Sequence, residues 1–268
     1  MKRKQHISPS KLYTGDRCGP LNVDSVGGGK FVLTFTVDCT RYVTVYFIKS
    51  KSELLSLFVE YVTMMENETD LRVRAIRTGD TGGEYTSQYF KKFCADKGIA
   101  HQLTNPNTPE QNGVSERLNR TLIESARSML IHAKMPLKFW AEAVNTAVYL
   151  HNRSPTSALK EKTPVESWFR KKPNMSNLKV SGSVCFVHTP VHLRKKLDPK
   201  SRKAAFVGYP WKVKATKCMK WMLNVSQDAE RLFFMRTSFI HLTKLPTAHF
   251  STKTMWVTRR NPMLSEMS

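Results

Sequence analysis

Short apolar runs alternate with amphipathic segments over the first hundred residues of the chain. Residues 31–37 and 41–48 are rich in Val, Phe, Tyr and Thr, a pattern that predicts two strands. Their short connections to each other and to the segment around residue 16 predict three antiparallel strands. Ser50 and Glu53 then have the spacing of a capping box, and apolar residues follow at positions 54, 55, 58, 59 and 62. A helix is therefore expected after the third strand.

The alternation continues after this helix. Apolar residues before Asp80 predict a fourth strand, residues 87–97 an amphipathic helix and residues 99–103 a short fifth strand. A helix between the third and fourth strands makes a crossover, so the fourth strand should run parallel to the first. The turn-rich residues 105–109 lead into a long helix, and residues 136–152 predict a further helix of the core. The expected apolar face of the long helix is Val114, Leu118, Leu122, Ala126, Met129 and Leu130.

Acidic residues stand at the ends of these predicted elements. Asp80 follows the fourth strand at a Gly turn, where α/β folds often place reactive side chains. Glu116 lies near the start of the long helix, with thirty-five residues between it and Asp80, and a loop is expected at residues 112–113. In a basic chain this pair predicts a metal site aimed at phosphates, since Mg²⁺ binds one or two carboxylates together with phosphate oxygens. Asp16 is the best candidate for a third acid on the first strand, and Asp38 is the alternative.

Three motifs carry a resemblance to a known family. They are Asp16-Arg17-Cys18-Gly19-Pro20, Gly82-Gly83-Glu84-Tyr85, and the run from Thr108 to Arg120 that contains Gln111-Asn112-Gly113-Val114-Ser115-Glu116. In this order and with this gap, they closely resemble the integrase core of copia-type LTR retrotransposons, within the retroviral integrase superfamily. The similarity continues through residues 139–143, 152–155, 163–164 and 206–209, and so covers residues 12–210.

The order of the elements and the resemblance predict the same fold class. Both indicate an α/β, RNase H-like fold with a mixed five-stranded sheet and flanking helices, followed by a small basic β-rich domain. In that fold the first strand neighbours the fourth, so Asp16 and Asp80 should lie side by side, with Glu116 reaching them from the long helix. The resemblance implies two Mg²⁺ or Mn²⁺ ions that share Asp16, with Asp80 and Glu116 each holding one.

The resemblance also implies an activity, metal-dependent processing of DNA 3′ ends followed by strand transfer. Water is the nucleophile in the first step, and the 3′-hydroxyl is the nucleophile that joins target DNA. The expected partners are element ends, target DNA and further copies of the chain, because two ends must be joined together. The expected location is the nucleus or a cytoplasmic particle. Candidate contacts to DNA ends on the long helix and after it are Asn119, Arg120 and Lys134.

The charge of the chain points to a polyanionic partner. There are 43 Lys and Arg against 21 Asp and Glu, which leaves a net charge of +22. Nucleic acid is favoured over a membrane, because no polybasic amphipathic helix or lipidation signal accompanies this charge. Five cysteines occur without a Cys-x-x-Cys pair, and the sequence has neither a signal peptide nor a long apolar run. Both features favour an intracellular protein with free thiols.

The most basic stretch follows the predicted core. Residues 178–188 and 204–209 predict strands, and residues 194–220 hold ten cations against the single acid Asp198. A β-rich domain with a basic face commonly holds a nucleic-acid backbone, since each neutralised phosphate releases counterions. A merely solvated basic surface is the alternative. The candidate DNA-binding residues here are Arg194, Lys195, Lys196, Lys200, Arg202 and Lys203.

Five parts are expected along the chain. They are a basic arm at 1–11, the RNase H-like core at 12–158, a linker with a short helix at 159–175, a basic β-rich region at 176–250 and a disordered tail at 251–268. No His and Cys set with zinc-ligand spacing precedes Asp16, so no zinc is expected. Thr81 also replaces the Asn that the family usually has after the second Asp. A catalytically impaired or domesticated nucleic-acid-binding remnant is therefore the alternative function, and a nuclease acting on RNA hybrids is a second competing enzyme.

Overall fold

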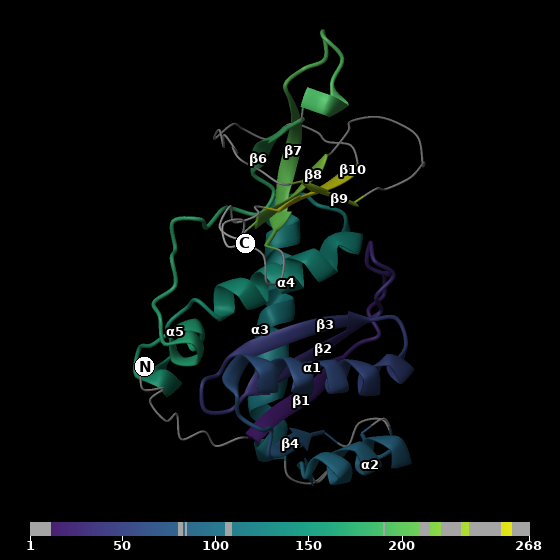
Figure 1. Ribbon diagram of the computed structural model, residues 1–268, viewed down its shortest axis with the longest axis vertical. Helices are drawn as coiled ribbons and strands as arrows, with labels where there is room; N and C mark the ends of the chain where they lie inside the picture. The colour runs from purple at the N-terminus through teal and green to yellow at the C-terminus, as the bar shows by residue number, and fades with distance from the viewer. Residues whose placement is uncertain are drawn as a thin grey trace, which may run out of the picture. The chain divides into compact units, whose positions relative to one another are not determined.

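The computed structural model divides the chain into two compact units (Figure 1). It describes residues 12–79, 83, 85–104, 109–189, 191–209, 215–220, 232–235 and 253–258. The first unit comprises Met1–Glu124 and Ala147–Asn174, and the second comprises Ser125–Thr146 and Met175–Ser268. Over the described residues, no helix combines the length and apolar character that crossing a bilayer requires.

The first unit is built on a mixed five-stranded sheet with the order β3-β2-β1-β4-β5. Its strands are β1 (Leu12–Cys18), β2 (Phe31–Val37), β3 (Val43–Ile48), β4 (Ala75–Thr78) and β5 (Ala100–Leu103). The first three run antiparallel, whereas β4 is parallel to both β1 and β5. The predicted α/β class is confirmed, and the first strand neighbours the fourth as expected.

Helices flank this sheet, and in Figure 1 α1 lies in front of it and α3 behind it. The helices of the chain are α1 (Leu54–Thr69), α2 (Gln88–Lys97), α3 (Pro109–His132), α4 (Trp140–His151) and α5 (Pro164–Phe169). Short 3₁₀ turns are η1 (Lys51–Glu53), η2 (Leu137–Phe139), η3 (Ser157–Leu159) and η4 (Val191–Leu193). Because both faces are covered, every residue of β2 is buried.

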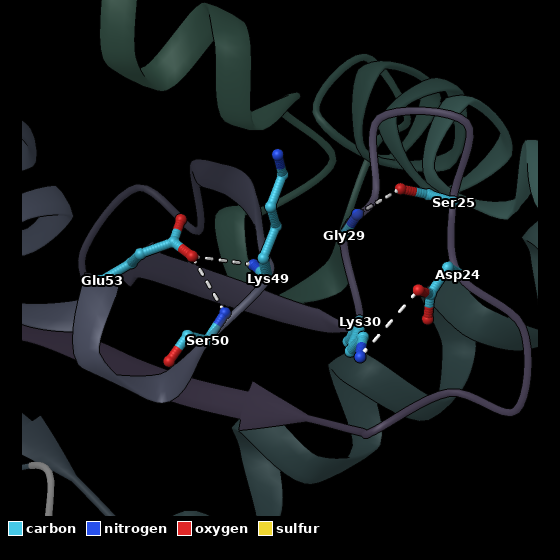
Figure 2. A network of polar contacts seen from close by, with 7 residues as sticks. All are labelled: Asp24, Ser25, Gly29, Lys30, Lys49, Ser50 and Glu53. Atoms are coloured by element: carbon cyan, nitrogen blue, oxygen red, sulfur yellow. Dashed lines mark hydrogen bonds and ion pairs between the residues drawn. The ribbon is translucent and has the colours of Figure 1, made fainter.

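Local polar contacts set the ends of β2 and β3 (Figure 2). The Glu53 carboxylate accepts from the backbone N–H of Ser50 at 2.9 Å and of Lys49 at 3.1 Å, which is the acidic half of the predicted capping box. In the predicted turn before β2, the backbone N–H of Gly29 donates to the Ser25 hydroxyl at 2.8 Å. These contacts fix where α1 begins and where β2 enters the sheet.

An aromatic cluster forms the core between the sheet and its helices. The rings of Phe35 on β2 and Tyr61 on α1 stack with centroids 4.4 Å apart, and Phe58 stacks on Phe90 of α2 at 4.9 Å. All four side chains are fully buried. Aromatic pairs of this kind add roughly 0.5–1.5 kcal/mol beyond their area burial. The cluster therefore holds α1 and α2 firmly against β2, the strand that pairs with β1.

The long helix α3 buries a different face from the one predicted. Val114, expected in the core, is 46% exposed, whereas Ser115 and Asn119 are buried. The buried positions 115, 119, 122, 126 and 130 keep helical spacing, so the prediction was wrong by one position over the first turns. The expected loop at residues 112–113 is also wrong. The helix already begins at Pro109, because proline suits a first helical position.

Asn152 pairs with the outer edge of the sheet. It follows α4 and is buried, and β3 is an edge strand of the first sheet. Its amide accepts from the backbone N–H of Val43 at 2.9 Å and donates to the backbone carbonyl of Val43 at 2.8 Å. Its own carbonyl accepts from the backbone N–H of Val165 in α5 at 2.8 Å. One residue thus joins two helices to the sheet edge.

Replacing Asn152 with Ala should lower the free energy of unfolding by about 2–4 kcal/mol. The change leaves a buried N–H and a buried carbonyl of Val43 without their partner, and each such loss costs about 1–3 kcal/mol. Urea denaturation followed by circular dichroism measures the effect. Ser154→Ala, at an exposed position nearby, should change stability by no more than about 0.5 kcal/mol. Equal midpoints for the two variants would contradict this role of Asn152.

The second unit carries another five-stranded sheet, with the order β6-β7-β8-β10-β9. Its strands are β6 (Val184–His188), β7 (Ser201–Gly208), β8 (Ala215–Lys220), β9 (Leu232–Met235) and β10 (Lys253–Thr258). The strand predicted over 178–188 begins only at Val184. Gly182 turns the chain there with φ +81°, and a Cβ on it would lie 2.5 Å from the Cβ of Ala133.

The disorder expected over residues 251–268 is wrong for Lys253–Thr258, which form β10. This strand pairs antiparallel with β8 and parallel with β9. The hydrogen bonds that order it come from strands distant in the sequence, which explains why its own weak pattern did not predict it. The predicted basic arm at 1–11 and the rest of the predicted tail lie outside the described residues.

Candidate metal centre

The candidate site is built on the middle strand of the first sheet. Asp16 lies in β1 opposite Thr34 of β2, and its neighbour Gly15 pairs with Thr78, the last residue of β4. A Cβ on Gly15 would lie 3.1 Å both from the ring of Phe35 and from the hydroxyl of Tyr85. Glycine at this position therefore allows close packing immediately before Asp16.

Asn119 of α3 ties the Asp16 carboxylate to the sheet. Its amide nitrogen donates to Asp16 Oδ2 at 2.9 Å, and its amide oxygen accepts from the Thr34 hydroxyl at 3.0 Å. The other carboxylate oxygen, Asp16 Oδ1, accepts from the backbone N–H of Arg17 at 2.8 Å. Both oxygens of Asp16 are thus held by donors, and the orientation of the Asn119 amide is set from its other end by Thr34.

Glu116 lies close enough to Asp16 for its negative charge to affect the pKa of the Asp16 carboxyl. Burial is the largest influence on the Asp16 carboxyl and raises its pKa. Hydrogen bonds from the Arg17 backbone and from Asn119 lower that pKa, and the negative charge of Glu116 raises it again. The net shift of the Asp16 pKa is upward. Two carboxylates that repel each other in this way, one partly buried and one exposed, are a donor set that a divalent cation would neutralise.

The structure places two of the three predicted acids near each other. Glu116 of α3, three residues before Asn119, is near enough to Asp16 of β1 for its charge to raise the pKa of Asp16. Asp80, two residues beyond the end of β4, lies outside the described residues. Within the described part of the chain, no group of three or more His, Cys, Asp and Glu residues could hold a metal ion. The carboxylate oxygens of Asp16 and Glu116 are nevertheless the hard ligands that Mg²⁺ prefers.

Asp38, the alternative first ligand, lies in the turn after β2. That turn is next to the Tyr13 end of β1, because Tyr13 pairs with Val37 while Asp16 pairs with Thr34 three positions along. The Asp38 carboxylate accepts from the Arg41 guanidinium at 3.0 Å and forms an ion pair with it. This partner gives Asp38 a local structural role in the turn.

Asn119 was predicted to contact DNA ends from an exposed helix position, but the structure shows that it is buried. The residue is only 7% exposed, and its amide is engaged at both ends. Its spacing of three residues from Glu116 already placed both on one helix face. The missed signal was Thr34, a polar residue in a strand buried on both faces. Arg120 and Lys134 are exposed and remain predicted DNA contacts.

The raised pKa of Asp16 predicts how stability changes with pH. The folded protein holds this proton more tightly than the unfolded chain, so stability falls as pH rises from the usual carboxyl range through the raised pKa. Asn cannot titrate, so Asp16→Asn lacks this loss. We therefore expect the stability of Asp16→Asn relative to the unmodified protein to increase between about pH 3 and pH 7.

Urea denaturation in the presence of EDTA, repeated at several pH values, measures this difference. The control is Asp38→Asn, since Asp38 is paired with Arg41 and lies away from Glu116 along the sheet. A stability of Asp16→Asn that falls relative to that of the unmodified protein as the pH rises would contradict the raised pKa.

The predicted DNA-binding cations lie around β7 in the second unit. Lys195, Lys196 and Lys200 are exposed in the connection from β6 to β7, and Arg202 and Lys203 are exposed within β7. Arg194, in the same connection, is half-buried. Five of these six candidate cations are therefore exposed, and their contact with DNA stays a prediction.

Comparison with known proteins supports the resemblance. Residues 183–223 match the retroviral polymerase SH3-like domain. Over 198 residues the chain is 44% identical to the retrovirus-related Pol polyprotein from transposon TNT 1-94 of Nicotiana tabacum, and the alignment covers 74% of this chain and 15% of that protein. The chain is homologous to the Pol polyproteins of copia-type plant transposons. The predicted resemblance is therefore confirmed.

Two further Pol polyproteins show similar identity. Those from transposons RE2 and RE1 of Arabidopsis thaliana are each 34% identical, over 195 and 190 residues. The alignments cover 73% and 71% of this chain and 13% of each Pol polyprotein. The chain thus spans about a seventh of the length of these relatives.

A solved structure is also similar to this chain. It is the catalytic core domain of HTLV-2 integrase in complex with magnesium, in a trimeric form. The match has a TM-score of 0.45 at 20% identity and covers 60% of this chain and 97% of that one.

Proposed function

We propose that the chain is the catalytic core of a retrotransposon integrase. It would trim the 3′ ends of element DNA and join them to target DNA in a metal-dependent reaction. The observation that carries the proposal is the hydrogen bond from Asn119 to Asp16, which places α3 and its Glu116 near enough for the Glu116 charge to raise the pKa of Asp16. The net charge of +22 and the homology to Pol polyproteins support DNA as the substrate.

Asp16, Asp80 and Glu116 are the residues that would hold Mg²⁺ or Mn²⁺, with two ions proposed. Bound there, the metal would polarise phosphate oxygens and assist deprotonation of the attacking water or 3′-hydroxyl. The fit rests on the donor chemistry, since carboxylate oxygens suit these cations and the repulsion between Asp16 and Glu116 is relieved by a positive charge.

Asn119 and Thr34 are proposed to position the Asp16 carboxylate. Asn119 occupies one side of Asp16 Oδ2, and Thr34 holds the far end of the same amide. The carboxylate then enters the reaction with its direction already set, which lowers the cost of arranging ligands for catalysis. Self-association is proposed as well, because joining two DNA ends at once requires more than one active site.

The deciding experiment incubates the purified protein with an end-labelled duplex that carries the terminal sequence of the element. With Mg²⁺ or Mn²⁺ we expect shortened strands from end processing and longer strands from joining, and neither product with EDTA. Absence of both products in either metal would overturn the proposal in favour of a nucleic-acid-binding remnant. Degradation of the RNA strand in RNA–DNA hybrids, without any joining, would instead indicate a nuclease.

A further inference from the structure

The connection between β6 and β7 exposes three aliphatic side chains. Val191 is 73% exposed, Leu193 65% and Leu197 99%. We refer to residues 191–200 as the hairpin tip, and in Figure 1 it extends beyond the ends of β6 and β7. Aliphatic side chains are unfavourable in water, and a group of them at the end of a projecting hairpin indicates a surface that another molecule covers.

Backbone contacts hold the hairpin tip in one conformation. The backbone N–H of Thr189 donates to the Lys200 carbonyl at 3.0 Å and closes its base. The N–H of Arg194 donates to the Val191 carbonyl at 3.1 Å, and the N–H of Lys195 donates to the Asp198 carboxylate at 3.0 Å. The apolar side chains are thus presented by an ordered turn, so binding through them loses little conformational entropy.

Positive charge surrounds the apolar side chains. The cations from residue 191 to residue 203 are Arg194, Lys195, Lys196, Lys200, Arg202 and Lys203. The single acid of this segment is Asp198, whose carboxylate is engaged in the turn. Two more exposed cations, Arg202 and Lys203, follow in β7.

This combination fits duplex DNA better than a protein or a lipid surface. Exposed cations bind phosphates, and aliphatic side chains among cations are what minor-groove proteins insert between base pairs. We propose that Leu193 and Leu197 form an apolar wedge that enters the DNA minor groove and partly unstacks a base step. The neighbouring lysines would hold the flanking phosphates.

The inference rests on the proposed function only in taking DNA as the partner. It adds a deformation of the DNA at a place defined by two leucines. Unstacking a base step kinks the duplex. The wedge would therefore favour flexible pyrimidine–purine steps over stiff A-tracts, without any hydrogen bond to a base.

Fluorescence of 2-aminopurine tests the wedge, because this base becomes brighter when it unstacks. The unmodified protein is titrated with 2-aminopurine duplexes in EDTA, and we expect fluorescence to rise at least about twofold at saturation, most at pyrimidine–purine steps. The double variant Leu193→Ala/Leu197→Ala should bind more weakly but show no rise even at saturating protein. EDTA blocks catalysis, so an inactive metal site cannot affect the result.

Two control variants separate the wedge from other effects. Leu137→Ala, 61% exposed on η2, removes the same side chain outside the hairpin tip and should retain the full rise. Lys195→Ala/Lys196→Ala should weaken binding yet keep the rise at saturation. A full rise with the double leucine variant would overturn the proposal. The proposal would also be overturned if the double leucine variant bound DNA normally but no longer bound anionic phosphatidylglycerol vesicles. The hairpin tip would then be a membrane contact.

Discussion

Asp16→Asn and Glu116→Gln should each reduce end processing and joining by about 10³-fold or more in Mg²⁺ or Mn²⁺. Both substitutions keep the shape of the side chain and remove the charge that holds the cation. Asp80→Asn should have the same effect if Asp80 is the third ligand. Rates of product formation from the labelled duplex measure the loss, and DNA binding should survive in all three variants, because the basic surface around β7 is unchanged.

Asp38→Asn is the matched control for this prediction. Its carboxylate pairs with Arg41 in the turn after β2, so its loss should leave the rates almost unchanged. If Asp38→Asn abolishes joining while Asp16→Asn does not, the first ligand has been assigned wrongly. A second measurement is independent of activity: Mg²⁺ should raise the melting temperature of the unmodified protein and leave that of Asp16→Asn unaffected.

The affinity for duplex DNA should fall steeply with salt, by about 10³-fold or more between roughly 50 and 200 mM. The expectation follows from the net charge of +22 and from the exposed cations around β7. Fluorescence anisotropy at several salt concentrations gives the slope of log affinity against log salt. Charge reversal in Lys195→Glu/Lys196→Glu should reduce the magnitude of that slope by about two, because two phosphate contacts are lost.

The matched control for charge reversal is Lys91→Glu/Lys92→Glu on α2. It changes the net charge by the same amount at exposed positions of the first unit. A smaller loss of affinity in this control places the contact at the hairpin tip and β7. A flat salt dependence in the unmodified protein would show that the positive charge does not serve DNA binding. Equal losses of affinity in the two charge-reversal variants would show that no local surface carries the DNA contact.

The first sheet could be predicted because each of its signals is local. The apolar pattern of residues 31–37 reproduces β2, and the capping box at Ser50 marks the approach to α1. The parallel direction of β4 followed from the crossover helix, and its adjacency to β1 followed from the RNase H-like order of the elements. The register of α3 could not be predicted, because Ser115 and Asn119 look like surface residues until their partners are known. Thr34 and Asp16 supply the partners of Asn119 from strands far away in the sequence.

The second sheet was harder to predict for the same reason. Lys253–Thr258 pair with Ala215–Lys220, more than thirty residues earlier in the chain. Short strands of this kind are stabilised by the neighbours they find, and their own residues carry little pattern. The candidate site shows the opposite case. Its acids were predicted from spacing and family motifs, whereas the amide that orients Asp16 was found only in the folded chain.

Asn152 also bears on how separate copies of the chain behave toward one another. An uncovered edge strand is a template on which a second molecule can add its own strand. The Asn152 amide occupies the outward N–H and carbonyl of Val43 as a neighbouring strand would. Without it, β3 would offer a ladder position to other molecules. One side chain at the end of a helix therefore helps keep the protein from aggregating through this sheet edge.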